Sequence, residues 1–120
     1  MSARAKRIDD AFTALADPAR RRAVELLAGK PRRAGELARA LRVSPSVMSK
    51  HLRILRDRAL VTETHPAHDT RVRIYSLRSA PMADLRAWLE ATERGWAEQL
   101  SAFAAHLRPL GTPDGGERKP

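Results

Sequence analysis

The chain has 120 residues, the size of one small domain, and a formal net charge of +9. It contains no cysteine, which excludes disulfides, thiolate metal sites and a cysteine nucleophile. No apolar run approaches the length of a membrane span, and the first residues lack the apolar segment of a signal peptide. We therefore expect a cytoplasmic protein with no membrane partner.

The positive charge is concentrated in the middle of the chain. Residues 31–78 hold eleven Lys or Arg and four Asp or Glu, whereas residues 79–107 hold two and four. A basic centre beside a mildly acidic segment is typical of a polyanion-binding face with a separate face for a partner.

The first predicted helix covers residues 8–16. Ile8, Phe12 and Leu15 are spaced four and three apart, which places them on one face of a helix. Residues 1–7 lack this periodicity, and we expect them to form a flexible N-terminal arm.

A second helix is predicted to begin at Asp17 and Pro18, as N-cap and first helical residue, and to end at Gly29. Residues 20–22 are three arginines in its first turn, where the helix dipole disfavours positive charge. Either they are solvated, or an anion such as a DNA phosphate neutralises them.

The next two elements have the helix-turn-helix pattern. Residues 35–41 predict a short amphipathic helix, and Ser44 with Pro45 predicts the start of another. Three residues at helical spacing give this later helix one apolar face: Met48, Leu52 and Leu55. Its other face carries hydroxyls and cations, which is typical of a helix that enters the major groove. An ordinary solvated helix has a similar face, so the motif alone leaves both interpretations open.

A β-hairpin is predicted directly after this helix. Residues 60–64 and 72–77 are β-branched runs separated by a polar loop. A hairpin in this position forms the wing of a winged helix-turn-helix, and Arg71 and Arg73 would then reach phosphates or the minor groove.

The last predicted helix covers residues 80–107 and carries apolar residues at spacings of three and four throughout. A long helix with two tryptophans and a phenylalanine on or beside this stripe favours a dimer interface over a ligand pocket. Residues 108–120 are rich in Pro and Gly, and we expect a disordered tail.

Four motifs in this order resemble the ArsR/SmtB family of winged-helix bacterial repressors. They are ALADPARR at residues 14–21, GELA at 35–38, SPSVMSKHLRIL at 44–55 and RALV at 58–61, and the resemblance covers residues 8–107. It implies a mainly α winged helix-turn-helix fold: four helices, a two-stranded wing and a long C-terminal dimerisation helix. It also implies a homodimer that binds an inverted-repeat operator in double-stranded DNA and represses transcription.

The resemblance assigns candidate site residues. Base or phosphate contacts to DNA are implied for Ser44, Ser46, Val47, Ser49, Lys50, Arg53, Arg71 and Arg73. Contacts across a two-fold dimer interface are implied for Ile8, Phe12, Leu89, Trp96, Leu100 and Phe103. Val47 is suited to touch a thymine methyl group.

The metal-sensing positions of the family are not filled by metal ligands in this chain. Arg33 and Gly35 stand where metal sensors carry a C-x-C pair, and Trp96 with Gln99 stands where a second ligand pair is expected. Together with the tryptophan-bearing last helix, the four motifs resemble most the branch whose members act without metal, as autorepressors or as regulators of stress and metabolism. The loop cluster of His65, His68 and Asp69 supplies only three ligands on a flexible loop, so we expect neither a metal nor another cofactor.

No Gly-rich phosphate loop or supported catalytic set is present, so we expect no enzyme activity. Two functions remain open: a dimeric sequence-specific repressor, and a binding module that uses the long helix and has only non-specific DNA affinity. The sequence identifies neither the operator nor an inducer. Three forms of regulation remain open: an apolar small molecule bound near Trp88 and Trp96, a partner protein, or the expression level alone.

Overall fold

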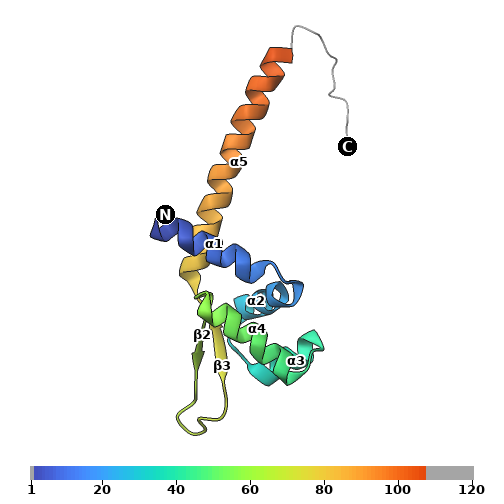
Figure 1. Cartoon of the computed structure of the whole chain (residues 1–120), viewed down its shortest axis with the longest axis vertical. Coiled ribbons are helices and arrows are strands. Elements are labelled where there is room, and N and C mark those ends of the chain that lie inside the picture. Colours follow the sequence, from blue (N-terminus) through green and yellow to red (C-terminus); the bar gives the residue numbers. More distant parts are fainter. Residues whose placement is uncertain (1, 108–120) are drawn as a thin grey trace. The chain divides into compact units, whose positions relative to one another are not determined.

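The computed structural model describes residues 2–107, and the expected disordered tail lies outside the described residues. The described chain is mainly helical with a small antiparallel sheet, and it has the predicted winged helix-turn-helix architecture (Figure 1). The elements in chain order are α1 (Ala3–Leu15), α2 (Pro18–Gly29), β1 (Arg32–Arg33), α3 (Ala34–Leu41), α4 (Pro45–Asp57), β2 (Val61–Thr64), β3 (Ile74–Leu77) and α5 (Ser79–Leu107). The chain divides into two compact units, residues 1–86 and 87–120.

The core of the first unit contains the predicted apolar face of α4. Met48, Leu52 and Leu55 are each at most 1% exposed and pack with apolar side chains from α1, α2, α3 and the sheet. Burying side chains of this size contributes about 1.5–3 kcal/mol each. Because this face is fixed in the core, the opposite face of α4 points into solvent.

Helix α1 begins at Ala3, five residues before the predicted start, so residues 3–7 are helical in place of the expected flexible arm. The Ser2 hydroxyl caps the helix by accepting a hydrogen bond from the Ala5 N–H at 3.0 Å. Lys6 pairs with Asp10 on the next turn at 3.0 Å. A cap and an ion pair carry no apolar periodicity, which is why the spacing of apolar residues did not reveal this turn.

The junction between α1 and α2 shows what two of the three consecutive arginines at residues 20–22 contact. Asp17 caps α2 as predicted, accepting hydrogen bonds from the backbone N–H of Ala19 at 2.8 Å and of Arg20 at 3.3 Å. The Arg20 Nε donates to the carbonyl of Ala14 at 2.7 Å, and Arg21 Nη1 donates to that of Leu15 at 2.8 Å. These two guanidinium groups therefore supply hydrogen bonds to backbone carbonyls at the end of α1. The negative end of the α1 dipole, rather than a DNA phosphate, lies beside their positive charge.

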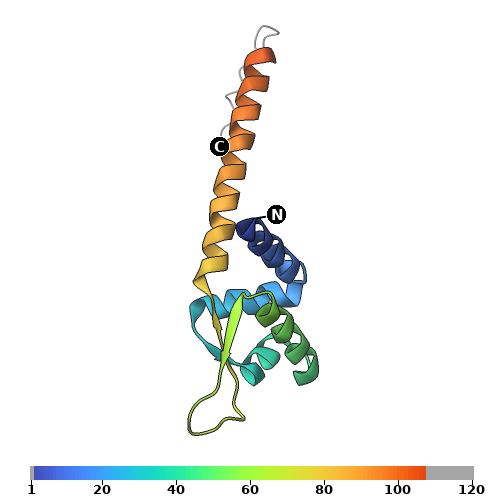
Figure 2. The ribbon, with the colours of Figure 1, turned by 60° about the vertical axis from the view of Figure 1, so that its left-hand side comes forward.

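The sheet has three strands in the order β1-β3-β2, one more than the predicted hairpin. Both neighbours pair with β3 antiparallel, with Arg32 and Glu63 each opposite Tyr75. Figure 2 shows β2 and β3 leading into the loop of the wing. The extra strand is only two arginines long and has no β-branched pattern, so its sequence carried no strand signal.

The described part of the second unit, residues 87–107, is a continuation of α5 with an exposed apolar stripe. Leu89, Trp96, Leu100 and Phe103 are 57–60% exposed and spaced seven, four and three residues apart. Ile8, expected beside them in a dimer interface, is only 9% exposed and belongs to the core of the first unit. No helix of residues 2–107 is both long and apolar enough to cross a membrane.

Candidate nucleic-acid interface

The turn between α3 and α4 sets the direction of α4. Helix α3 ends at Leu41 and is capped by Arg42, whose left-handed backbone conformation (φ 57°, ψ 45°) is uncommon for a residue with a side chain. The next N–H, that of Val43, donates to the carbonyl of Ala38 at 3.1 Å, and Ser44 Oγ then accepts from the N–H of Val47 at 3.2 Å. This C-cap and N-cap lie within three residues and give a helix-turn-helix, as predicted.

The solvent face of α4 carries the DNA-contact residues predicted for this helix. Ser44, Ser46, Val47, Lys50 and Arg53 are exposed, whereas Ser49 is half-buried. Val47 is 42% exposed, which is unusual for a β-branched apolar side chain on a polar face. This side chain is available to contact an apolar group such as a thymine methyl.

Lys50 and Arg53 leave the outer face of α4 positively charged. Within residues 2–107 neither side chain has a hydrogen bond or an ion pair, although other cations of the first unit do. Two cations without a protein counter-ion, beside exposed hydroxyls, are suited to contact the phosphates and base edges of DNA.

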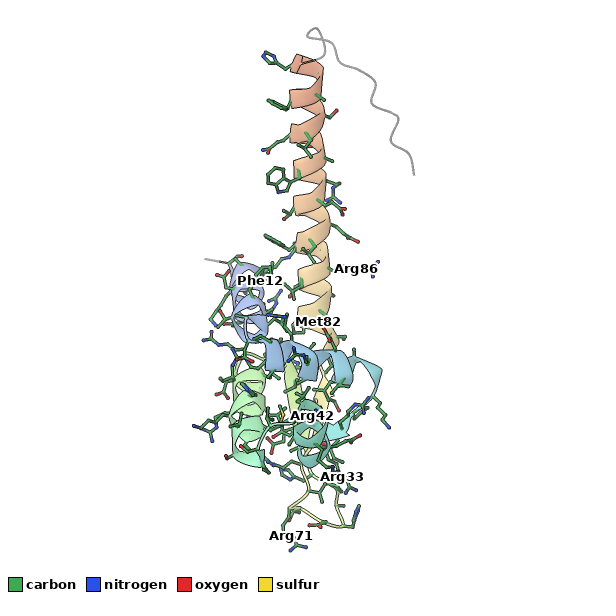
Figure 3. The ribbon with its side chains drawn as sticks, turned by 90° about the vertical axis from the view of Figure 1, so that its right-hand side faces the viewer. Phe12, Arg33, Arg42, Arg71, Met82 and Arg86 are labelled. Carbon is green, nitrogen blue, oxygen red and sulfur yellow. The ribbon has the colours of Figure 1, made fainter. Side chains whose placement is uncertain are left out.

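Arg71 lies on the loop of the wing, with its side chain 91% exposed (Figure 3). Its Nε donates a hydrogen bond to the Asp69 carboxylate at 3.2 Å, and its backbone N–H donates another at 3.0 Å. These two hydrogen bonds lower the pKa of the Asp69 carboxyl. An exposed ion pair of this kind contributes little stability, so phosphate can compete for the guanidinium at small cost.

Arg73, predicted to contact DNA from the wing, is half-buried and hydrogen-bonded to two other residues of the first unit. Its Nη2 donates to Ser49 Oγ at 3.0 Å and its Nη1 donates to the Tyr75 hydroxyl at 3.3 Å. The guanidinium also lies 6.0 Å from the centre of the Tyr75 ring. Arg73 directly precedes β3 and stands two residues before Tyr75, so the alternation of an extended backbone places both side chains on one side, but nothing in the sequence indicated the link to α4.

A basic cleft of about 330 Å³ lies between the start of α3 and the wing, and the sequence did not predict it. Four arginines line it: Arg33, Arg39, Arg71 and Arg73. Figure 3 shows Arg33 and Arg71 at the same end of the first unit. Its one acidic residue, Glu36, is paired with Arg32 at 3.2 Å, so the cleft has an excess of positive charge. The cleft therefore adds a second basic surface, between α3 and the wing, to the cations on the outer face of α4.

The residues of the wing loop do not form a metal site in the described part of the chain. No three His, Cys, Asp or Glu side chains of residues 2–107 gather where they could hold a metal ion. His65 instead places Nδ1 3.0 Å from the carbonyl of Val72 and Nε2 3.2 Å from the Glu63 carboxylate.

Comparisons with known proteins agree with this geometry. Residues 17–63 match the family described as bacterial regulatory protein, arsR family. The HTH-type transcriptional regulator Rv2034 of Mycobacterium tuberculosis (strain ATCC 25618 / H37Rv) is 44% identical over 96 residues, which cover 80% of this chain and 84% of that protein.

Two solved structures share the fold. The ArsR-like transcriptional regulator from Rhodococcus sp. RHA1 has a TM-score of 0.68 and 26% identity, covering 82% of this chain and 91% of its own. HlyU from Vibrio cholerae N16961 has a TM-score of 0.61 and 26% identity, covering 81% and 99%. The chain belongs to the ArsR family of bacterial transcriptional regulators, and it is a DNA-binding helix-turn-helix protein rather than an enzyme.

Proposed function

We propose that this regulator is a cytoplasmic homodimer that represses transcription by binding an inverted-repeat operator. The observation that carries the proposal is the outer face of α4, where Lys50 and Arg53 have no protein counter-ion within the described chain and stand beside exposed hydroxyls. In this proposal Ser46, Ser49 and Lys50 face the bases. Phosphates are contacted by Ser44 and Arg53 on α4, and by Arg71 on the wing.

The dimer is supported by the exposed stripe on α5. Leu89, Trp96, Leu100 and Phe103 lie on one helical face, and leaving four large apolar side chains more than half exposed is unfavourable in water. A second copy of the same stripe covers it in a two-fold arrangement. Aromatic side chains are enriched in such interfaces.

Dimerisation determines the expected form of the operator. Two copies of α4 related by a two-fold axis read two half-sites in opposite orientation, with centres about 34–36 Å apart along the DNA. We therefore expect an inverted repeat with half-sites one helical turn apart. Binding over a promoter blocks RNA polymerase, which accounts for repression.

The experiment is a selection from random DNA followed by a reporter assay. Purified protein is expected to enrich an inverted repeat, and the repeat placed over a promoter is expected to lower reporter expression when the protein is present. Enrichment of a single half-site would contradict the dimeric operator, and higher expression with the protein would contradict repression. A variant with Lys50→Ala and Arg53→Ala controls for effects that do not depend on the outer face of α4.

A further inference from the structure

A chain of hydrogen bonds connects the wing to the DNA-facing side of α4. The Tyr75 hydroxyl lies 3.1 Å from Glu63 Oε1 and 3.3 Å from Arg73 Nη1. Arg73 Nη2 lies 3.0 Å from Ser49 Oγ. This series of hydrogen bonds thus connects β2, through Tyr75 of β3, to a serine that the proposed function places against the bases.

The donor and acceptor groups of these side chains determine the direction of every hydrogen bond that connects Glu63 to Ser49. A guanidinium only donates and a carboxylate only accepts, so the Tyr75 hydroxyl donates to Glu63 and accepts from Arg73. Burial on its own favours the neutral acid of Glu63, but hydrogen bonds from Tyr75 and Arg56 outweigh it and lower the pKa of the carboxyl. Burial is the largest cause that raises the pKa of the Tyr75 hydroxyl, and the Glu63 carboxylate raises it further. Both groups therefore keep these protonation states at neutral pH.

The last hydrogen bond of the chain determines what the Ser49 hydroxyl can do. A serine hydroxyl has one hydrogen to donate and two lone pairs that accept. Arg73 occupies one lone pair, and its positive charge draws electron density from Oγ, which makes the hydroxyl a better donor and a poorer acceptor. Within the described residues, the Ser49 hydroxyl has no other hydrogen-bond partner, so its hydrogen remains for a ligand.

We propose that Arg73, held by Tyr75 and Glu63, makes Ser49 a hydrogen-bond donor toward DNA and so determines base preference at one operator position. A serine without such a partner reads donors and acceptors alike, whereas this one selects an acceptor: N7 or O6 of guanine, N7 of adenine or O4 of thymine. It disfavours the N4 amino group of cytosine. Arg73 is thus a positioning residue for base recognition, and the inference rests on the proposed function because it requires α4 to lie in the major groove.

The test measures affinity for the selected operator and for variants with each of the four base pairs at each half-site position. Ser49→Ala is expected to abolish the base preference at one operator position, and this is the position that Ser49 reads. Arg73→Met removes the donors but keeps a long side chain, and we expect it to reduce the same preference about tenfold. Tyr75→Phe keeps the buried ring, removes one anchor of Arg73, and is expected to reduce the preference less.

Arg71→Met is the matched control, because it removes an arginine from the same wing without touching Ser49. It is expected to weaken binding to all variants equally. A Ser49→Ala/Arg73→Met double variant should lose no more preference than Ser49→Ala alone. Circular dichroism and thermal melting check that each variant is folded, and Tyr75→Phe carries the test if Arg73→Met is not.

The outcomes separate the inference from the proposed function. If Ser49→Ala abolishes a preference that folded Arg73→Met and Tyr75→Phe both retain, or if the preferred base presents only an amino group, the inference is wrong and the operator stands. If Ser49→Ala changes no preference, Ser49 reads no base and the inference is also wrong. If the wild type prefers no sequence at all, the proposed function fails and the inference fails with it.

Discussion

The guanidinium of Arg20 donates a hydrogen bond to the backbone carbonyl of Ala14 over 2.7 Å, so the first turn of α2 satisfies the last turn of α1. A second bond, from Arg21 to Leu15 at 2.8 Å, acts in the same way. Two of the three consecutive arginines are thus engaged in the fold, and the basic residues proposed for DNA lie elsewhere, on α4 and the wing.

Arg20→Ala is expected to lower the free energy of unfolding by about 1–2 kcal/mol, because it leaves a part-buried carbonyl without its partner. Urea denaturation measures the change. Arg22→Ala removes the same charge from an exposed position two residues away and is the control, with an expected change within about 0.5 kcal/mol. Equal losses in both variants would contradict the structural role of Arg20.

Local signals in the sequence were sufficient for most of the fold. The caps at Asp17 and Ser44 each combine an N-cap residue with a following proline, so both helix starts could be predicted from four residues. The apolar spacing of Met48, Leu52 and Leu55 likewise predicted the buried face of α4. These features depend on neighbours in the chain and need no tertiary contact.

The features that the sequence did not reveal depend on contacts between distant segments. Arg73 and Ser49 are 24 residues apart, and their hydrogen bond exists only because the wing packs beside α4. The basic cleft also forms only when α3 and the wing meet. Charge composition predicted a basic surface, but which arginines are hydrogen-bonded to other parts of the protein follows from the packing.

Glu63 makes stability depend on pH in the acid range. Because its pKa is lower in the folded than in the unfolded protein, the carboxylate stabilises the fold above its unfolded pKa, and this is lost as the pH falls through the folded value. Glu63→Gln is expected to lower the free energy of unfolding by about 1 kcal/mol at neutral pH and by much less at strongly acid pH. Urea denaturation over a pH series measures this difference, and a difference that does not shrink toward acid pH would show that Glu63 acts through packing.

Leu100→Glu is expected to dissociate the proposed dimer, because an unpaired charge buried in an apolar interface costs several kcal/mol. Sedimentation velocity at micromolar concentration measures the mass. Ala91→Glu introduces the same charge at an exposed position on the side of α5 that faces away from the stripe, and should leave the dimer intact. A wild type that sediments as a monomer, or equal dissociation of both variants, would end the assignment of this stripe to the dimer.

Operator binding is expected to be indifferent to divalent metals. The chain has no cysteine, and within residues 2–107 no three imidazole or carboxylate groups gather where they could hold an ion. The measurement is a titration of zinc, nickel and cobalt against the operator complex, with a His65→Ala/His68→Ala double variant as the control. Release of DNA at micromolar metal that the double variant abolishes would place a sensor in the wing.

The central claim, that α4 reads base sequence while the wing holds phosphate, is tested most directly by affinity for the selected operator and for scrambled DNA over a salt series. The wild type is expected to favour the operator by at least about 10³-fold. Lys50→Ala should cost about 1–3 kcal/mol on the operator and relax one position per half-site. Arg71→Ala should weaken binding to both DNAs alike and flatten the salt dependence. Equal affinity of the wild type for both DNAs, or an unchanged preference after Lys50→Ala, would contradict the account.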